Sequence, residues 1–237
     1  AIVLNTLAEV ELRRGHTAEA LSAVEEATEI ADYWGVVHAE AAVLPTTALV
    51  RGTIGDVDEA RHAAERALEL MRPVGYDVIV RSAERALGFL EISLGDAAAA
   101  HAVLEPLITG SGLRHPTAEA AAADEIEALL ALGMVADAEA LLAAFATQAE
   151  RTRRPRASAA VARSAALAAA ARDDLDAALG HADRAVVLAA AWEPFERGRA
   201  LLVLGLVSRR AKRRRAAREA LESALAVFDA LPAPLWA

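Results

Sequence analysis

The stretch Gly55–Leu70 reads Gly-Asp-Val-Asp-Glu-Ala-Arg-His-Ala-Ala-Glu-Arg-Ala-Leu-Glu-Leu and predicts a turn followed by a helix. Gly55 can end the preceding helix, because glycine adopts the left-handed conformation that closes a helix at little cost. Asp56 is a candidate N-cap, and Glu59 can complete a capping box with it. Alanines then recur at helical spacing along one face, at Ala60, Ala64 and Ala67.

The same turn recurs along the whole chain, with spacings of 40, 40, 38, 40 and 39 residues. The equivalent turn positions are Gly15, Gly55, Gly95, Gly133, Asp173 and Lys212. Five residues after each of them stands an alanine: Ala20, Ala60, Ala100, Ala138, Ala178 and Ala217. Small residues also stand seven before and twelve after most turns, although the fourth unit has Ile126 and Phe145 there. Because small side chains let two antiparallel helices approach closely, each unit is predicted to be a helical hairpin.

These repeats predict an all-α fold, a right-handed superhelical solenoid of six antiparallel hairpins that form a single repeat domain over residues 1–237. The expected hairpins cover residues 2–33, 37–71, 77–109, 117–150, 156–190 and 194–230. Any bend is expected in the loose linker 108–117. Since each hairpin contacts mainly its neighbours, the ends should fray first and should leave apolar edges exposed. A homodimer formed through such edges is one expected consequence.

The amino-acid composition excludes several classes of protein. The chain is 55% hydrophobic but only 4% aromatic, which favours alanine-rich helices over sheets. It has no cysteine, which excludes disulfides and thiolate metal sites, and its net charge of −9 argues against direct nucleic-acid contact. No uncharged stretch could span a membrane, and no signal peptide is visible. We expect a piece of a longer cytoplasmic protein, because the chain lacks an initiator Met and starts inside a helix pattern.

No motif predicts catalysis. The six histidines show no His-Glu-x-x-His pattern, so we expect them at solvated helix edges and expect no metal site. The acidic runs are typical of helix N-termini and exposed faces, and no Gly-x-Ser-x-Gly elbow occurs. We therefore expect neither an enzyme nor a cofactor in this segment. The basic run 209–218 is interpreted as a solvated turn, with contact to DNA or to an acidic partner as the alternative.

The phrase from Leu7-Ala8 through Gly15 to Ala20 and Ala27 resembles the tetratricopeptide repeat (TPR), although that unit is typically 34 residues long. The lengthened unit resembles the superhelical region of the large LuxR-type, maltose-regulator-like transcriptional activators. Residues 194–237 are similar to the segment that precedes the DNA-binding module in that family. The resemblance implies flanking nucleotide-binding and DNA-binding modules of the same chain as partners, but this segment has no phosphate-binding Gly-x-x-x-x-Gly-Lys loop.

The resemblance implies a non-enzymatic region that binds a protein or small-molecule effector and relays the signal within a transcriptional regulator. The alternative is an intramolecular scaffold that holds the nucleotide-binding module without an external ligand, and a stand-alone enzyme is a third hypothesis. In tetratricopeptide proteins the first helix of each hairpin lines a concave groove. Carried over by position, the groove residues are Ser82, Arg85, Phe89, Arg163, Leu167, Arg199 and Leu202. Their arginines would offer positive charge to an acidic peptide or an anionic effector.

Overall fold

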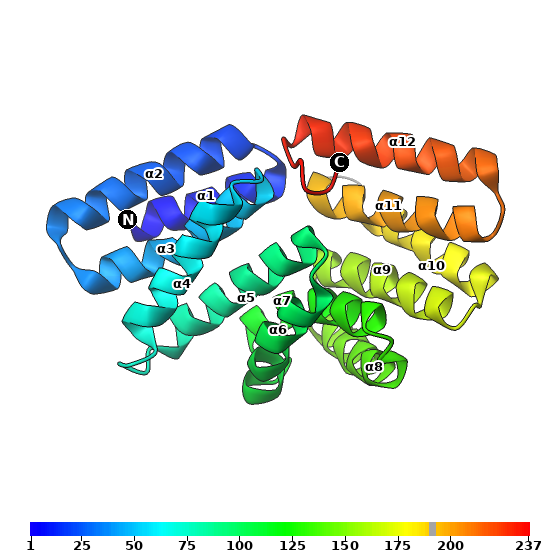
Figure 1. Cartoon of the computed structure of the whole chain (residues 1–237), viewed down its shortest axis with the longest axis horizontal. Helices are drawn as coiled ribbons and strands as arrows, with labels where there is room; N and C mark the ends of the chain where they lie inside the picture. The colour runs from blue at the N-terminus through cyan, green and yellow to red at the C-terminus, as the bar shows by residue number, and fades with distance from the viewer. Residues whose placement is uncertain (190–192) are drawn as a thin grey trace.

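The computed structural model describes residues 1–189 and 193–237, and within them the chain forms helices and no strand (Figure 1). The helices are α1 (Ile2–Arg14), α2 (Thr17–Trp34), α3 (Val37–Thr53), α4 (Val57–Met71), α5 (Asp77–Leu94), α6 (Ala97–Ser111), α7 (Pro116–Ala131), α8 (Val135–Thr152), α9 (Pro155–Ala171), α10 (Leu175–Leu188), α11 (Pro194–Arg210) and α12 (Arg214–Ala230). The all-α repeat fold expected from the sequence is confirmed. No described helix is both long and apolar enough to cross a membrane.

The small residues of the repeat lie where paired helices touch. The six alanines that follow the turns are all buried, and Ala20, Ala100 and Ala178 have no exposed surface at all. A methyl group at Gly88 would overlap the side chain of Leu104, and one at Gly205 would lie 2.6 Å from Leu221 Cγ. The helices of these two hairpins are therefore packed so closely that a larger residue at Gly88 or Gly205 would force a neighbouring leucine to move.

The turns within the hairpins share one backbone conformation. Glycines hold it at four of them, with φ between 77° and 85°: Gly15, Gly55, Gly95 and Gly133. Asp173 and Lys212 adopt the same left-handed region, with φ of 62° and 59°. The expected capping by Asp56 is wrong, because its side chain caps no backbone N–H and instead pairs with Arg51 at 3.3 Å. The Asp56 carboxylate therefore pairs with Arg51 and does not cap α4.

The last hairpin returns to the first, so the array closes into a ring (Figure 1). Thr17 Oγ1 donates a hydrogen bond to the carbonyl oxygen of Leu231 at 3.1 Å. The segment 232–237, called here the C-terminal tail, continues across the ring, and Trp236 Nε1 donates to Ser93 Oγ at 3.0 Å. The expectation that both ends of the array stay uncovered is therefore corrected. The superhelix curves far enough for its two ends to contact each other.

The linker 108–117 lies on the side of the ring opposite this closure, between α6 and α7 (Figure 1). The two large residues of the fourth unit, Ile126 and Phe145, are 0% and 2% exposed and belong to one core cluster over α7, α8 and α9. Bulky side chains therefore fill the hairpin contact that mostly alanine and glycine make in the other units. At the free outer face of α1, by contrast, Ile2 and Val3 remain exposed.

Candidate functional site

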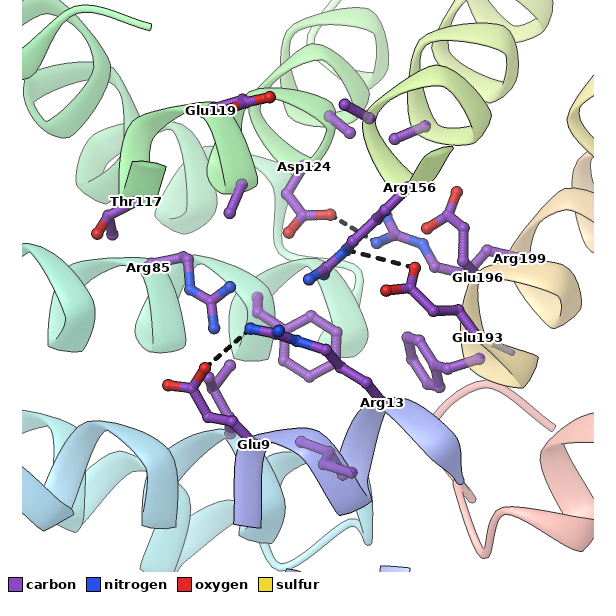
Figure 2. Close-up of a pocket in the computed structure, with 18 of the residues that line it drawn as sticks. Glu9, Arg13, Arg85, Thr117, Glu119, Asp124, Arg156, Glu193, Glu196 and Arg199 are labelled. Carbon is purple, nitrogen blue, oxygen red and sulfur yellow. Dashed lines mark hydrogen bonds and ion pairs between the residues drawn. The ribbon is translucent and has the colours of Figure 1, made fainter. Parts of the chain in front are cut away.

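A cavity of about 510 Å³ lies at the centre of the ring, and we call it the central cavity (Figure 2). It is lined mainly by the first helix of each of the six hairpins, α1, α3, α5, α7, α9 and α11. Phe145 of α8 and Leu231 also reach it. Its volume falls within the ~300–1,000 Å³ that small-molecule sites usually occupy. The groove expected from the tetratricopeptide resemblance is therefore present as a cavity surrounded by the ring.

Five of the seven groove residues inferred from the sequence line the central cavity: Ser82, Arg85, Phe89, Arg163 and Arg199. Leu167 and Leu202 do not line it. Leu167 packs against the core between α9, α10 and α11, and Leu202 packs against the cluster around Phe228. The reason is that the cavity reaches no further along α9 than Arg163 and no further along α11 than Arg199, and both leucines lie beyond these residues.

Arg163 and Arg199 are each paired with two carboxylates, although one nitrogen of each guanidinium, Arg163 Nη2 and Arg199 Nε, has no hydrogen-bond partner. Arg163 Nε lies 2.7 Å from Glu196 Oε1, and its Nη1 lies 2.9 Å from Glu127 Oε2. Arg199 contacts Asp124 and Glu127, each at 2.7 Å. Burial lowers the pKa of Arg199, but the three carboxylates around it outweigh burial and raise its pKa above the ordinary value. Their charge is thus balanced by acids of α7 and α11 and is not offered to a ligand.

Arg85 differs from these two arginines. Within the described part of the chain it makes no hydrogen bond and no ion pair, and its side chain points into the central cavity (Figure 2). Burial and the neighbouring cations Arg156 and Arg13 lower its pKa to about 10, although Glu9 and Asp124 act in the opposite direction. Arg85 is therefore a cation in an electrostatically unfavourable place.

Two further arginines face Arg85 from other helices (Figure 2). Arg13 of α1 pairs with Glu9 at 2.9 Å, and Arg156 of α9 reaches Glu193 at 3.6 Å. Burial raises the pKa of Glu193, with Glu196 adding to the rise, while Arg156 and Arg13 act against it. Sequence reasoning missed Arg13 and Arg156, because only the closure of the ring brings α1 and α9 opposite α5.

One wall of the central cavity is aromatic. Phe89 and Phe195 line it with their ring centroids 5.7 Å apart, and both contact Trp236 of the C-terminal tail, at 6.4 and 5.5 Å. Trp236 also packs on Phe228 at 6.0 Å, and the guanidinium of Arg199 lies 4.7 Å from its ring. Phe89, one of the groove residues inferred from the sequence, is thus part of an apolar wall. The tail is thereby attached to the wall of the cavity.

Other candidate residues lie elsewhere. Among the described residues, no three His, Asp or Glu side chains gather as a metal site would require. His101 is half-exposed on α6, and its Nδ1 lies 2.6 Å from the buried carboxylate of Glu125, a partner that the sequence did not predict. In the basic run 209–218, Arg210 and Arg213 pair with Asp173 and Asp176 of the preceding hairpin, as expected of a solvated turn. The aromatic residues Tyr33, Trp34 and Tyr76 are exposed and lie outside the central cavity.

Comparison with known proteins supports the fold. No family model and no curated protein sequence matches the chain. Among solved structures, BtubC (BKLC) from P. vanneervenii is similar with a TM-score of 0.59 and 18% identity, over 92% of this chain and 91% of that one. A putative kinesin light chain from Podosopora anserina with nearly identical TPR-like repeats is similar with a TM-score of 0.53 and 19% identity, over 78% of this chain and 92% of that one. At these identities the likeness shows the fold alone, which is that of TPR-like helical repeat proteins.

Proposed function

We propose that this chain is a non-enzymatic binding region that holds a small-molecule effector in the central cavity and relays its presence through the C-terminal tail. The observation that carries the proposal is the closed ring, in which the repeat groove has become a cavity of about 510 Å³. In line with the resemblance of residues 194–237, we place this region in a LuxR-type transcriptional regulator. Its nucleotide-binding and DNA-binding modules would then receive the signal.

The closure favours a small molecule over a peptide. A peptide that binds a helical repeat groove needs an open channel along several repeats. Here Leu231 contacts the turn after α1, and Pro234 of the C-terminal tail lies against the turn after α3: a methyl group at Gly15 would lie 2.6 Å from Leu231 Cδ2, and one at Gly55 would lie 2.6 Å from Pro234 Cγ. A small molecule fits inside this ring without displacing a hairpin, whereas a protein partner would have to open it.

The relay rests on the position of Trp236. Its ring contacts Phe89 and Arg199, two residues that line the central cavity, while its Nε1 bonds to Ser93. A ligand that repositions Phe89 therefore changes the surface on which the tail lies. Such a ligand shifts the ring between closed and open forms only as far as its affinities for the two forms differ.

The charge pattern supports a binding role over catalysis. All five carboxylates that line the central cavity are engaged by arginines: Glu9, Glu119, Asp124, Glu193 and Glu196. A general acid or base must be available to exchange a proton with the substrate, and pairing with a guanidinium keeps a carboxylate charged; Glu193, whose pKa burial raises despite Arg156, is the exception among the five. The enzyme hypothesis thus gains no support from this cavity.

Native mass spectrometry of the chain, incubated with small-molecule and peptide pools, tests the proposal. We expect one bound small molecule per chain and, in hydrogen exchange of the same complex, altered protection of the segment 232–237. Binding of peptides in preference to small molecules would contradict the proposal. Protein that stays bare in every pool would instead favour the intramolecular scaffold, with its own nucleotide-binding module as the partner.

A further inference from the structure

We infer that the central cavity binds a small organic anion whose carboxylate or phosphate group is held by Arg85, with Arg13 and Arg156 completing the anion-binding cluster. This inference rests on the proposed function, because it names the chemical class of the ligand for the same cavity. Three guanidinium groups from α5, α1 and α9 point toward one another there (Figure 2).

The contrast with Arg163 shows why Arg85 is the centre of the cluster. Arg163 has the same place in its repeat, ten residues before the turn, and is contacted by two carboxylates at 2.7 and 2.9 Å. Arg85 has no carboxylate within ion-pair distance in the described residues, and its surroundings include two other cations. Arg85 is half-buried and lines the cavity, and a guanidinium that is partly removed from water is normally paired, so an unpaired one there marks a place where a ligand supplies the counter-charge.

The neighbours of Arg85 limit the charge of the ligand. Glu9 holds Arg13 at 2.9 Å, and Glu193 lies near Arg156, so each flanking arginine is already partly neutralised. One compact oxyanion suits this balance, because a guanidinium can hold a carboxylate or phosphate through two parallel hydrogen bonds. A longer chain of phosphates would meet the carboxylates of Glu9 and Glu193.

The remainder of the ligand is expected to be apolar and compact. Phe89 and Phe195 form the aromatic wall beside the anion-binding cluster, and Leu12 and Leu49 line the cavity as well. An aromatic or branched hydrocarbon group attached to the oxyanion would pack on this wall, next to the seat of Trp236. The cavity volume of about 510 Å³ admits one such molecule.

An anion site built on Arg85 has a distinctive signature in the empty protein. A residue that serves only the fold destabilises the protein when it is removed. An arginine placed for a ligand, without a counter-ion of its own, instead lowers the stability of the empty protein, so its removal raises stability. Stability and ligand affinity should therefore change in opposite directions at Arg85.

The test uses phenyl phosphate and benzoate as probes and benzyl alcohol as their uncharged counterpart. Binding is measured by titration calorimetry and the unfolding midpoint by thermal denaturation, for the unaltered chain, Arg85→Gln and Arg81→Gln. Arg81 is the matched control, because it lies one turn away on α5, pairs with Asp77 at 2.9 Å and does not line the cavity. We expect Arg85→Gln to weaken binding of the anionic probes by about tenfold to a hundredfold.

The same Arg85→Gln variant should unfold at a higher temperature than the unaltered chain when both are empty, and Arg81→Gln should keep the probe affinity. Arg85→Lys, which keeps the charge but loses the planar fork, should retain part of the binding. The tighter of the two anionic probes identifies whether the head group is a phosphate or a carboxylate.

Equal affinity of the unaltered chain and Arg85→Gln for both anionic probes would overturn the inference, as would a lower unfolding midpoint of the empty Arg85→Gln protein. Binding of benzyl alcohol as tight as that of benzoate would also overturn it, but would leave the cavity as a site for uncharged effectors. The inference fails as well if neither anion binds the unaltered chain. In that case the native mass spectrometry experiment still tests the proposed function, because it shows whether any small molecule binds the chain.

Discussion

The two sides of the central cavity use arginine in opposite ways. On the side of α7, α9 and α11, Arg163 and Arg199 share the carboxylates of Asp124, Glu127 and Glu196, and both are almost fully buried. On the side of α5, Arg85 faces the cavity without a carboxylate partner. The first arrangement ties three hairpins together. The second leaves positive charge available, so the same residue type serves structure on one side and recognition on the other.

Breaking the paired side should have the largest effect. Arg163→Met removes the cation that Glu196 and Glu127 contact, and we expect a loss of about 3–5 kcal/mol in the free energy of unfolding, because the buried Glu196 is left unpaired. Urea denaturation measures this. The control is Arg172→Met, whose pair with Glu139 is exposed and should contribute about 1 kcal/mol or less. Equal losses in the two variants would show that the buried pairs do not hold the hairpins together.

Removing the contact that closes the ring should have the second-largest effect on stability. Trp236→Ala removes the ring that packs on Phe89 and Phe195, and we expect it to cost about 2–3 kcal/mol, less than a fully buried tryptophan because Trp236 is half-buried. Hydrogen exchange should speed up at the start of α2, where Thr17 contacts Leu231. Trp34→Ala, at a residue 70% exposed, serves as the control and should change stability by no more than about 0.5 kcal/mol. Unchanged exchange at Thr17 in Trp236→Ala would show that the tail does not close the ring.

Overpacking the contact between the two helices of a hairpin should have a somewhat smaller effect on stability. Ala178→Leu places three extra carbons into a contact that has no free surface, and overpacking should cost about 1–3 kcal/mol. Ala216→Leu on α12 is the matched control at an exposed position. An unchanged urea midpoint for Ala178→Leu would mean that α9 and α10 separate more easily than their packing indicates.

A smaller, pH-dependent effect separates the two faces of α7. Asp124 faces Arg199, whereas its neighbour Glu125 is buried against His101; burial raises the pKa of Glu125 to about 7, with Glu105 adding to the rise and His101 opposing it. The folded state therefore keeps a proton that the unfolded chain releases above about pH 4.5, so stability should fall as the pH rises from about 5 to 7. Glu125→Gln should flatten this slope, whereas Glu150→Gln, at an exposed site, should not. Urea denaturation at several pH values measures it, and equal slopes in all three proteins would show that Glu125 is not its source.

The sequence predicted much of the local structure because the repeat is a local property. The spacing of the turns and the alanine after each of them indicated hairpins, and Ala20, Ala100 and Ala178 lie buried in hairpin contacts. The repeat register also brought Arg85 and Phe89 to the cavity. It failed for Leu167 and Leu202, because the register says which face of a helix is inward but not how far along that helix the cavity extends.

Side-chain contacts that the repeat pattern does not specify explain the other differences. His101 meets Glu125 across two helices, and Asp56 prefers Arg51 to the helix end that it was expected to cap. Arg13 and Arg156 carry no motif that distinguishes them from other surface arginines. Each of these residues depends on a partner that a repeat pattern does not specify.

The sequence by itself determined that this protein is a stack of alanine-packed helical hairpins, because helix propensity, turn residues and the period of about 40 act between residues close in the chain. Only the tertiary structure decided that the stack closes into a ring, which arginines are neutralised and which one faces the cavity without a counter-ion. Small rotations between successive hairpins add up over the array. Their sum, which no single repeat encodes, brings Trp236 to Ser93 and sets Arg13 and Arg156 opposite Arg85.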